Sequence, residues 1–408
     1  MACLLKFPEG RCKGIVTFTT VEWGLIKASP ALLPQLQSTR SSYVTGLHFN
    51  WHDYQFDPPD EFDFFMAGPD DLRSIHGKPY RLLPMDACNF TPAAYRPASA
   101  DEKFWDVLIV GNPVFFKRPE VVLRTIRELF DRSDRSLQVL YICPMPQYRR
   151  MDEDTVLYDL RAYYEALFSA EERSRFMLLT TNFDSPNPFD RKVLSVFFRN
   201  SKVFLHCATE ERRCRIAAYA WSAGLPVVAY PSVASILPEP LRKTPGFYCV
   251  ERDDKYVDAL LAALSEFRSF DASGYRQVLS ETEAVRSFDQ ELRRVFDELA
   301  IPYGPTALMV QNLDRRLGWH HQGVSGLANG LGQSLSDFMN ELMAPENWVP
   351  ARQKLIREHD YPERVLADEL DSAGKLGVDE VMRRSVYLNP AKRRWLGRFK
   401  ALRARLLG

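Results

Sequence analysis

Short runs of apolar residues alternate with polar, amphipathic segments through most of the chain up to residue 300. In the N-terminal part, four runs have the length and the β-branched or aromatic content of strands. They are residues 14–20, 43–49, 62–66 and 80–84. Residues 23–37 favour a helix or turn region that Pro30 and Pro34 interrupt. Pro69, followed by two acidic residues, marks the start of a further helix.

A more regular alternation of strands and helices follows a polar, Pro-containing linker at residues 91–103. The predicted strands are residues 105–110, 137–143, 176–179, 201–206, 226–230 and 246–250. The predicted helices are residues 119–130, 155–168, 190–199, 213–223 and 254–268. Strands that alternate with helices of this length predict βαβ units on a parallel sheet. Right-handed crossovers then make a doubly wound, Rossmann-like domain over residues 104–299.

The predicted fold class is therefore α/β, with two Rossmann-like domains and a C-terminal extension. The first domain is residues 1–95 and is short, and the second is residues 104–299. Residues 300–408 are predicted to be mainly helical, punctuated by glycine and without strands.

Composition excludes several classes of protein. The chain has 408 residues, of which 46% are hydrophobic and 26% charged, which excludes intrinsic disorder, collagen-like repeats and a small disulfide scaffold. Basic and acidic residues number 53 each, and a zero net charge argues against a nucleic-acid binder. The zero net charge is a sum of opposite parts. Residues 389–408 hold seven Lys or Arg and no acid, so the rest of the chain is acidic by the same amount.

The cysteines indicate a reducing compartment and no metal site. The seven cysteines are scattered and include no C-x-x-C pair, which is typical of cytosolic proteins. No Cys/His cluster has the spacing of zinc ligands, and His320 and His321 are adjacent rather than one helical turn apart. No run approaches the ~18 apolar residues of a membrane span, and Pro8 breaks the N-terminal apolar run before it resembles a signal peptide. We expect a cytoplasmic protein.

Two strand ends in the second domain carry residues suited to a phosphorylated ligand. After the strand at 105–110, Gly111 allows a tight turn, and Lys117 and Arg118 precede the next helix. After the strand at 201–206 comes a segment with two acids and three arginines, residues 206–215. Ligands of open parallel sheets bind beyond the carboxyl ends of the strands, so both segments are candidates for one site.

These segments resemble the retaining glycosyltransferases of the GT-B type often called family 4. Their donor domain has a G-R-x-x-x-x-K-G turn, on which Gly111 and Lys117 fall. A later motif, E-G-F-G-x-x-x-x-E-A-x-A-x-G-x-P-V-V-A, is matched at Glu211, Ala220, Gly224, Pro226, Val227, Val228 and Ala229. Residues 83–92 are similar to the family's I-P-N-G-V-D-x-x-x-F-x-P segment before the interdomain linker. The three motifs agree in order and spacing over residues 82–299.

The chain also departs from the family pattern. Asn112 stands where the family has arginine, and Tyr219 where it has the second glutamate, which usually holds the nucleotide ribose. The Gly-Phe-Gly of the family is Arg212, Arg213 and Cys214 here. The N-terminal domain is shorter than in the family, so either it is trimmed or the C-terminal extension completes it.

The resemblance implies a metal-free site that offsets the charge of a leaving diphosphate with fixed cations and helix N-termini. It assigns the diphosphate to Lys117 and the sugar hydroxyls to Glu211, and His48 is a candidate for proton transfer near the acceptor. The donor-binding candidates are Gly111, Asn112, Arg118, His206, Arg212, Arg213, Arg215 and Tyr219. Trp51, His52 and Asp53 follow a strand and are further candidates to face the acceptor. No cofactor is expected, because the nucleotide sugar is a substrate.

The basic C-terminal end has an apolar stripe at helical spacing: Trp395, Phe399, Leu402 and Leu406. A basic amphipathic helix with a tryptophan is typical of a peripheral contact with an anionic membrane surface. The alternative is a helix that packs its stripe on the body of the protein.

The prediction from the sequence is a glycosyltransferase that moves a sugar, with retention, from a nucleotide-sugar donor to a polysaccharide or glycolipid acceptor. Two alternatives remain open: a sugar-nucleotide epimerase or hydrolase on the same frame, and an inactive scaffold that binds glycan or nucleotide sugar. The departures at Asn112 and Tyr219 are the reason why the scaffold stays open as an alternative.

Overall fold

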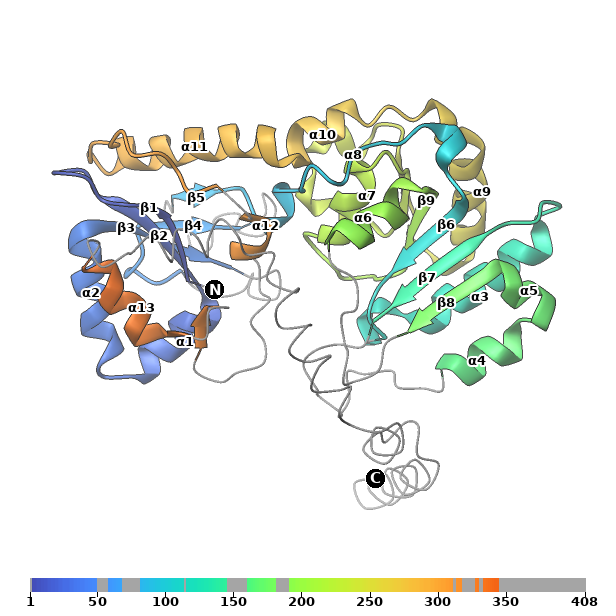
Figure 1. Ribbon diagram of the computed structural model, residues 1–408, viewed down its shortest axis with the longest axis horizontal. Helices are drawn as coiled ribbons and strands as arrows, with labels where there is room; N and C mark the ends of the chain where they lie inside the picture. The colour runs from blue at the N-terminus through green and yellow to red at the C-terminus, as the bar shows by residue number, and fades with distance from the viewer. Residues whose placement is uncertain are drawn as a thin grey trace, which may run out of the picture.

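A computed structural model describes residues 2–49, 58–67, 81–113, 115–144, 160–180, 191–310, 313–317, 327–329 and 333–344. Two sheets, each covered by helices, lie side by side (Figure 1). The expected fold class, α/β with two Rossmann-like domains, is confirmed by these sheets. Four sequence expectations lie outside the described residues: the helix at Pro69, the Trp51–Asp53 group, the histidine pair at 320–321 and the amphipathic helix at 389–408.

The N-terminal sheet has five strands in the order β1-β2-β3-β4-β5, and only β1 runs antiparallel to its neighbour. The strands are β1 (Cys3–Lys6), β2 (Gly14–Thr19), β3 (Tyr43–His48), β4 (Phe64–Met66) and β5 (Leu82–Leu83). Nearly every strand residue is buried, which is the pattern of a parallel sheet covered on both faces.

Two helices, not one interrupted segment, follow β2. They are α1 (Thr20–Ala28) and α2 (Leu32–Ser42). Pro30 lies between them, and Pro34 lies in the first turn of α2, where the backbone N–H has no intrahelical acceptor and can be missing. Thr19 and Glu22 form a capping box that starts α1.

The second sheet has six parallel strands in the order β11-β10-β9-β6-β7-β8. The strands are β6 (Trp105–Val110), β7 (Val139–Cys143), β8 (Phe176–Thr180), β9 (Ser201–His206), β10 (Val227–Ala229) and β11 (Phe247–Cys249). The chain order reverses between β6 and β9, which makes their carboxyl ends the switch point where ligands bind in such sheets.

Helices cover both faces of the second sheet. They are α3 (Pro119–Arg132), α4 (Leu160–Leu167), α5 (Ala170–Arg175), α6 (Arg191–Arg199), α7 (Arg215–Ser222), α8 (Glu239–Arg242), α9 (Tyr256–Glu266) and α10 (Ser273–Leu279). Side chains of α3 and α9 fill the core on one face, and those of α7 fill the core on the other. The 3-10 helices are η3 (Ala87–Asn89), η4 (Ala100–Glu102), η5 (Phe115–Lys117), η6 (Pro231–Ile236), η7 (Asp253–Lys255) and η8 (Phe267–Ser269).

After α10 the chain returns to the first domain through α11 (Glu281–Glu298), which runs along the top of Figure 1 toward β1. Phe288, Leu292 and Val295 of α11 pack in one core with Ile15 and Val44 of the N-terminal sheet. The rest of the described chain is α12 (Leu313–Arg316), β12 (Leu327–Asn329), β13 (Gln333–Ser334) and α13 (Leu335–Leu342).

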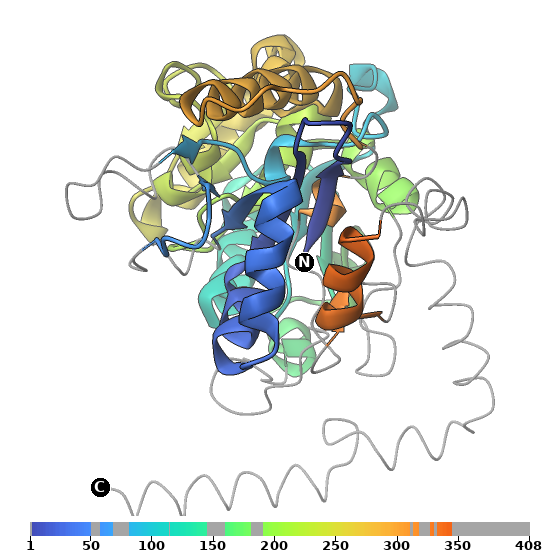
Figure 2. The ribbon, with the colours of Figure 1, turned by 90° about the vertical axis from the view of Figure 1, so that its left-hand side faces the viewer.

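The C-terminal segment contributes to the core of the N-terminal domain. Figures 1 and 2 show α13 against this domain, and its Phe338 and Leu342 pack in the core that contains Trp23. The Tyr43 hydroxyl donates to the carbonyl of Leu342 over 2.8 Å. The short first domain was expected either to be trimmed or to be completed by the C-terminal extension, and these contacts favour the second alternative.

One expectation for the extension was wrong. Residues after 301 were expected to hold no strand, but β12 and β13 form an antiparallel pair. They have three and two residues, which is too short for an alternating pattern to be visible. Among the described residues, no helix is long and apolar enough to cross a membrane.

Candidate functional site

The two predicted strand-end segments meet at the switch point of the second sheet. Lys117 ends η5, the short turn after β6, and Glu211 lies in the loop between β9 and α7. The Lys117 ammonium donates a hydrogen bond to Oε2 of Glu211, and both side chains are largely buried, with 13% and 14% exposed. The structure thus brings together the two residues that the resemblance assigns to the diphosphate and the sugar.

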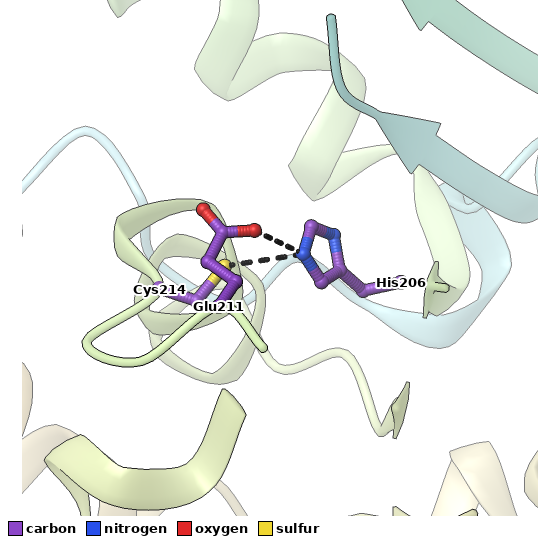
Figure 3. A group of neighbouring side chains, drawn as sticks. All are labelled: His206, Glu211 and Cys214. Atoms are coloured by element: carbon purple, nitrogen blue, oxygen red, sulfur yellow. Dashed lines mark hydrogen bonds and ion pairs between the residues drawn. The ribbon is translucent and has the colours of Figure 1, made fainter. Parts of the chain in front are cut away.

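His206 and Cys214 complete this cluster (Figure 3). His206 ends β9, and its Nε2 is hydrogen-bonded to the same Oε2 of Glu211. The Cys214 sulfur lies 3.7 Å from that nitrogen. His206 is 3% exposed and Cys214 is fully buried, so the cluster is largely shielded from water.

The charges of the cluster follow from burial and proximity. Burial alone would raise the pKa of Glu211, but Lys117 and His206 lower it far below its usual value, so the carboxylate is ionised. Burial alone would lower the pKa of His206, but Cys214 and Glu211 raise it to about 9. At neutral pH the cationic forms of Lys117 and His206 are therefore favoured beside the anionic groups of this cluster.

A second buried cluster joins the two domains. Arg213 donates from Nη1 to the Phe49 carbonyl over 2.7 Å and to Asp86 Oδ2 over 2.6 Å. His48, at the end of β3, is hydrogen-bonded through Nε2 to the same oxygen of Asp86 over 3.0 Å. Burial raises the pKa of Asp86, yet Arg213 and His48 lower it far more, so the carboxylate is ionised. The Cys88 thiol donates to the Arg213 carbonyl.

His48 was expected to be a proton-transfer group. The structure places it in this second cluster, 1% exposed and bonded to Asp86. That placement favours a positioning role between the domains, because a group that transfers a proton must reach the reacting atoms.

Three other predicted donor-binding residues lie in the same segment after β6 as Lys117. A Cβ at Gly111 would lie 3.9 Å from Cδ of Lys117, in ordinary van der Waals contact. Asn112 is partly exposed in the same turn. The Arg118 guanidinium is ion-paired with Asp253, which also accepts a hydrogen bond from Tyr230 over 3.0 Å, so its charge is already balanced.

The remaining candidates lie on or before α7. Arg212 is partly exposed in the loop, and Arg215 is partly exposed in the first turn of the helix. Tyr219 is buried, stacks on Tyr95 with 4.1 Å between ring centroids, and donates to Asp314 over 3.3 Å. At the position of the family's second glutamate, a tyrosine therefore contacts a carboxylate from the C-terminal segment.

Sequence reasoning missed four residues of these clusters. Asp86 lies three residues after the end of β5, so a carboxylate near a strand end was the available signal. Cys214 was noted only as a departure from a glycine. Asp253 and Asp314 have no local signal, because each reaches its partner from a distant part of the chain.

His206, Glu211 and Cys214 could also hold a metal ion. Their ligand atoms all lie within 4.8 Å of one another. The group has no sequence signature of a zinc site, because its one cysteine and one histidine are eight residues apart and its third member is a carboxylate.

No protein-family model and no curated protein matches the chain. Solved structures do match, at low identity. A GtfA/B complex is 12% identical over 66% of this chain and 55% of its own, with a TM-score of 0.45. Trehalose-6-phosphate synthase OtsA is 16% identical over 67% and 70%, with a TM-score of 0.42. Sucrose-phosphate synthase from Thermosynechococcus elongatus is 12% identical over 70% and 74%, with a TM-score of 0.47. Thus the chain spans little more than half of the first of these structures, and likeness at this level assigns no reaction.

Proposed function

We propose that this protein is a glycosyltransferase that takes a sugar from a nucleotide-sugar donor. The observation that carries the proposal is the contact between Lys117 and Glu211 at the carboxyl ends of β6 and β9. The two residues belong to separate motifs that are similar to the donor-binding motifs of one family.

The charges of the cluster suit the chemistry of this reaction. Cleavage of the anomeric C–O bond builds negative charge on the leaving diphosphate, and fixed cations stabilise that charge. Lys117 and His206 place two cationic groups around Glu211. Arg213 and Arg118, by contrast, are paired with Asp86 and Asp253. The diphosphate is therefore proposed to lie beside Lys117, at the start of α3, where backbone N–H groups also favour anions.

Calorimetry with a panel of nucleotide sugars tests the proposal. We expect one donor class to bind the full-length protein, and Lys117→Ala to weaken that binding by at least about tenfold, since it removes a charge-assisted contact. Lys243→Ala is the matched control, because that lysine is paired with Glu239 on exposed α8. If no nucleotide sugar binds the wild-type protein, the proposal fails.

A second candidate function is a scaffold that binds nucleotide sugar without turnover. Arg213 occupies the position where the family has the phenylalanine of Gly-Phe-Gly, and its side chain bonds to the Phe49 carbonyl of the other domain. Donor binding without any acceptor-dependent release of nucleotide would favour this candidate. Nucleotide release without an acceptor would instead indicate a hydrolase or epimerase.

The finer features of the reaction rest on the sequence. Transfer with retention and a polysaccharide or glycolipid acceptor are proposed from the motif resemblance, and contact with an anionic membrane from residues 389–408. Flotation with phosphatidylserine vesicles tests the membrane contact. We expect full-length protein to float, and a variant with its seven terminal Lys and Arg changed to Gln to remain at the bottom. Equal flotation of the two proteins would contradict it.

A further inference from the structure

The cluster in Figure 3 combines three side-chain types that bind soft divalent ions. Thiolate, imidazole and carboxylate are the ligands that proteins use for zinc, and three protein ligands leave one position of a tetrahedron open. Within the described part of the chain, no second group of three such side chains has converging ligand atoms.

The spacing of the sulfur and nitrogen ligand atoms fits a tetrahedral ion. Bonds of ~2.3 Å to sulfur and ~2.05 Å to nitrogen, at a tetrahedral angle, put those two atoms about 3.6 Å apart. The Cys214 sulfur and His206 Nε2 are 3.7 Å apart. The Glu211 oxygen contacts the same nitrogen, and all three ligand atoms lie within 4.8 Å of one another, so only the carboxylate has to move to admit an ion.

The backbone holds the three residues with little freedom. His206 is the last residue of β9, a strand hydrogen-bonded on both sides, and Cys214 is the N-cap residue of α7. Both side chains are almost fully buried. A short loop between two rigid elements therefore presents a preorganised chelate, and little conformational entropy is lost when an ion binds.

We propose that His206, Glu211 and Cys214 form a binding site for Zn²⁺ or a similar soft divalent ion. The ion replaces the hydrogen bond between His206 and Glu211. Lys117 stays bonded to the carboxylate as an outer partner, in the way that ligating carboxylates are commonly oriented. Because ligands must be deprotonated, binding releases the Cys214 thiol proton, and any proton on His206, to solvent.

A metal ion in this site also affects donor binding, a consequence that rests on the proposed function. A carboxylate that ligates an ion is no longer available to a sugar hydroxyl. We therefore expect the ion to inhibit donor binding, so that metal-bound and donor-bound protein are alternative states.

Cobalt titration of full-length, metal-stripped protein tests the site directly, since Co²⁺ replaces Zn²⁺ and reports its ligands. We expect one equivalent of Co²⁺ to produce a near-ultraviolet sulfur-to-cobalt charge-transfer band, which an equivalent of Zn²⁺ abolishes. Cys214→Ser should remove the band and weaken Co²⁺ binding by at least about tenfold. Cys249→Ser, which changes an exposed cysteine, is the matched control and should retain the band.

If Cys214→Ser does not fold, X-ray absorption spectroscopy at the zinc edge of the wild-type protein tests the site instead. One sulfur at ~2.3 Å with nitrogen and oxygen neighbours supports the site. Three results would overturn the site. They are the absence of stoichiometric metal binding, a zinc coordination shell without sulfur, and a cobalt band that depends on Cys249 and not on Cys214.

Donor calorimetry with and without one equivalent of Zn²⁺ tests the inhibition. A decrease of at least about tenfold in donor affinity supports it, and an unchanged affinity overturns it. The two proposals fail in distinguishable ways. Protein that binds donor in the presence of a chelator but forms no cobalt band contradicts only the metal site, and the reverse result contradicts only the proposed function.

Discussion

Arg213 donates a hydrogen bond of 2.6 Å to Asp86, and this buried ion pair crosses from the second domain to the segment that follows the first sheet. Arg213 adopts φ = 52°, in the left-handed region that non-glycine residues rarely occupy. The loop that carries Glu211 and Cys214 is thus attached to the N-terminal domain by a residue in a strained backbone conformation.

The first prediction concerns this ion pair. Arg213→Ala leaves Asp86 buried without its main counter-charge and should lower the free energy of unfolding by about 3–5 kcal/mol. Arg213→Gly should cost about 1 kcal/mol less, because glycine adopts a positive φ without strain. Urea unfolding measures both. Arg212→Ala is the control. If it lowered the free energy of unfolding as much as Arg213→Ala does, the role of the ion pair would be contradicted.

The same pair predicts an acid dependence. The pKa of Asp86 is far lower in the folded than in the unfolded protein, so its stabilising contribution is complete above the unfolded pKa of 3.8 and is lost as pH falls below it. We expect the stability of wild-type protein to drop more steeply between about pH 5 and 3 than that of Asp86→Asn. Exposed Asp101→Asn should keep the wild-type slope.

Lys103 predicts a dependence of the same sign in the alkaline range. Burial lowers the pKa of this lysine to about 8, from an ordinary value of 10.5, although its ammonium donates to the Ser201 carbonyl over 2.7 Å. The folded protein loses the proton first, so stability rises from pH 8 to 10.5. Lys103→Met should lose that rise, on the order of 3 kcal/mol. Equal pH profiles for wild-type and Lys103→Met proteins in urea unfolding would contradict the shift, and exposed Lys243→Met serves as control.

Two glycines should respond in opposite ways to alanine. A Cβ at Gly46 in β3 would lie 2.3 Å from the ring of Phe64, so Gly46→Ala should destabilise by about 1–3 kcal/mol. A Cβ at Gly24 in α1 meets nothing within 4 Å, and Gly24→Ala should stabilise the helix by up to about 1 kcal/mol. Thermal melts distinguish the two variants. A lower melting temperature for both would contradict the packing of α1.

The contribution of α13 to the N-terminal core predicts a long-range effect. Leu342 is fully buried in that core, so Leu342→Ala should destabilise by about 2–5 kcal/mol. Met343 is 42% exposed, and Met343→Ala should change stability by less than about 0.5 kcal/mol. Urea unfolding of full-length variants provides the comparison. Equal, small effects would show that the domain does not depend on this helix.

Local pattern was sufficient for most of the fold. Apolar runs and their helical spacers predicted β2, β3, β4, β5 and all six strands of the second sheet. Because a parallel sheet places the carboxyl ends of its strands at one edge, the pattern also placed Lys117 and Glu211 near each other. The pattern did not predict the short pair β12 and β13, because strands of two or three residues have no visible period.

The sequence by itself determined that two strand-end segments with cations and a carboxylate face a common edge. Only the tertiary structure decided that His206 and Cys214 join that carboxylate, that Arg213 and His48 share Asp86, and that α13 completes the first domain. The physical reason is the range of the interactions. Burial of alternate residues and βαβ geometry act over neighbouring elements, whereas these contacts depend on how distant surfaces fit together, and that fit has no periodic signal along the chain.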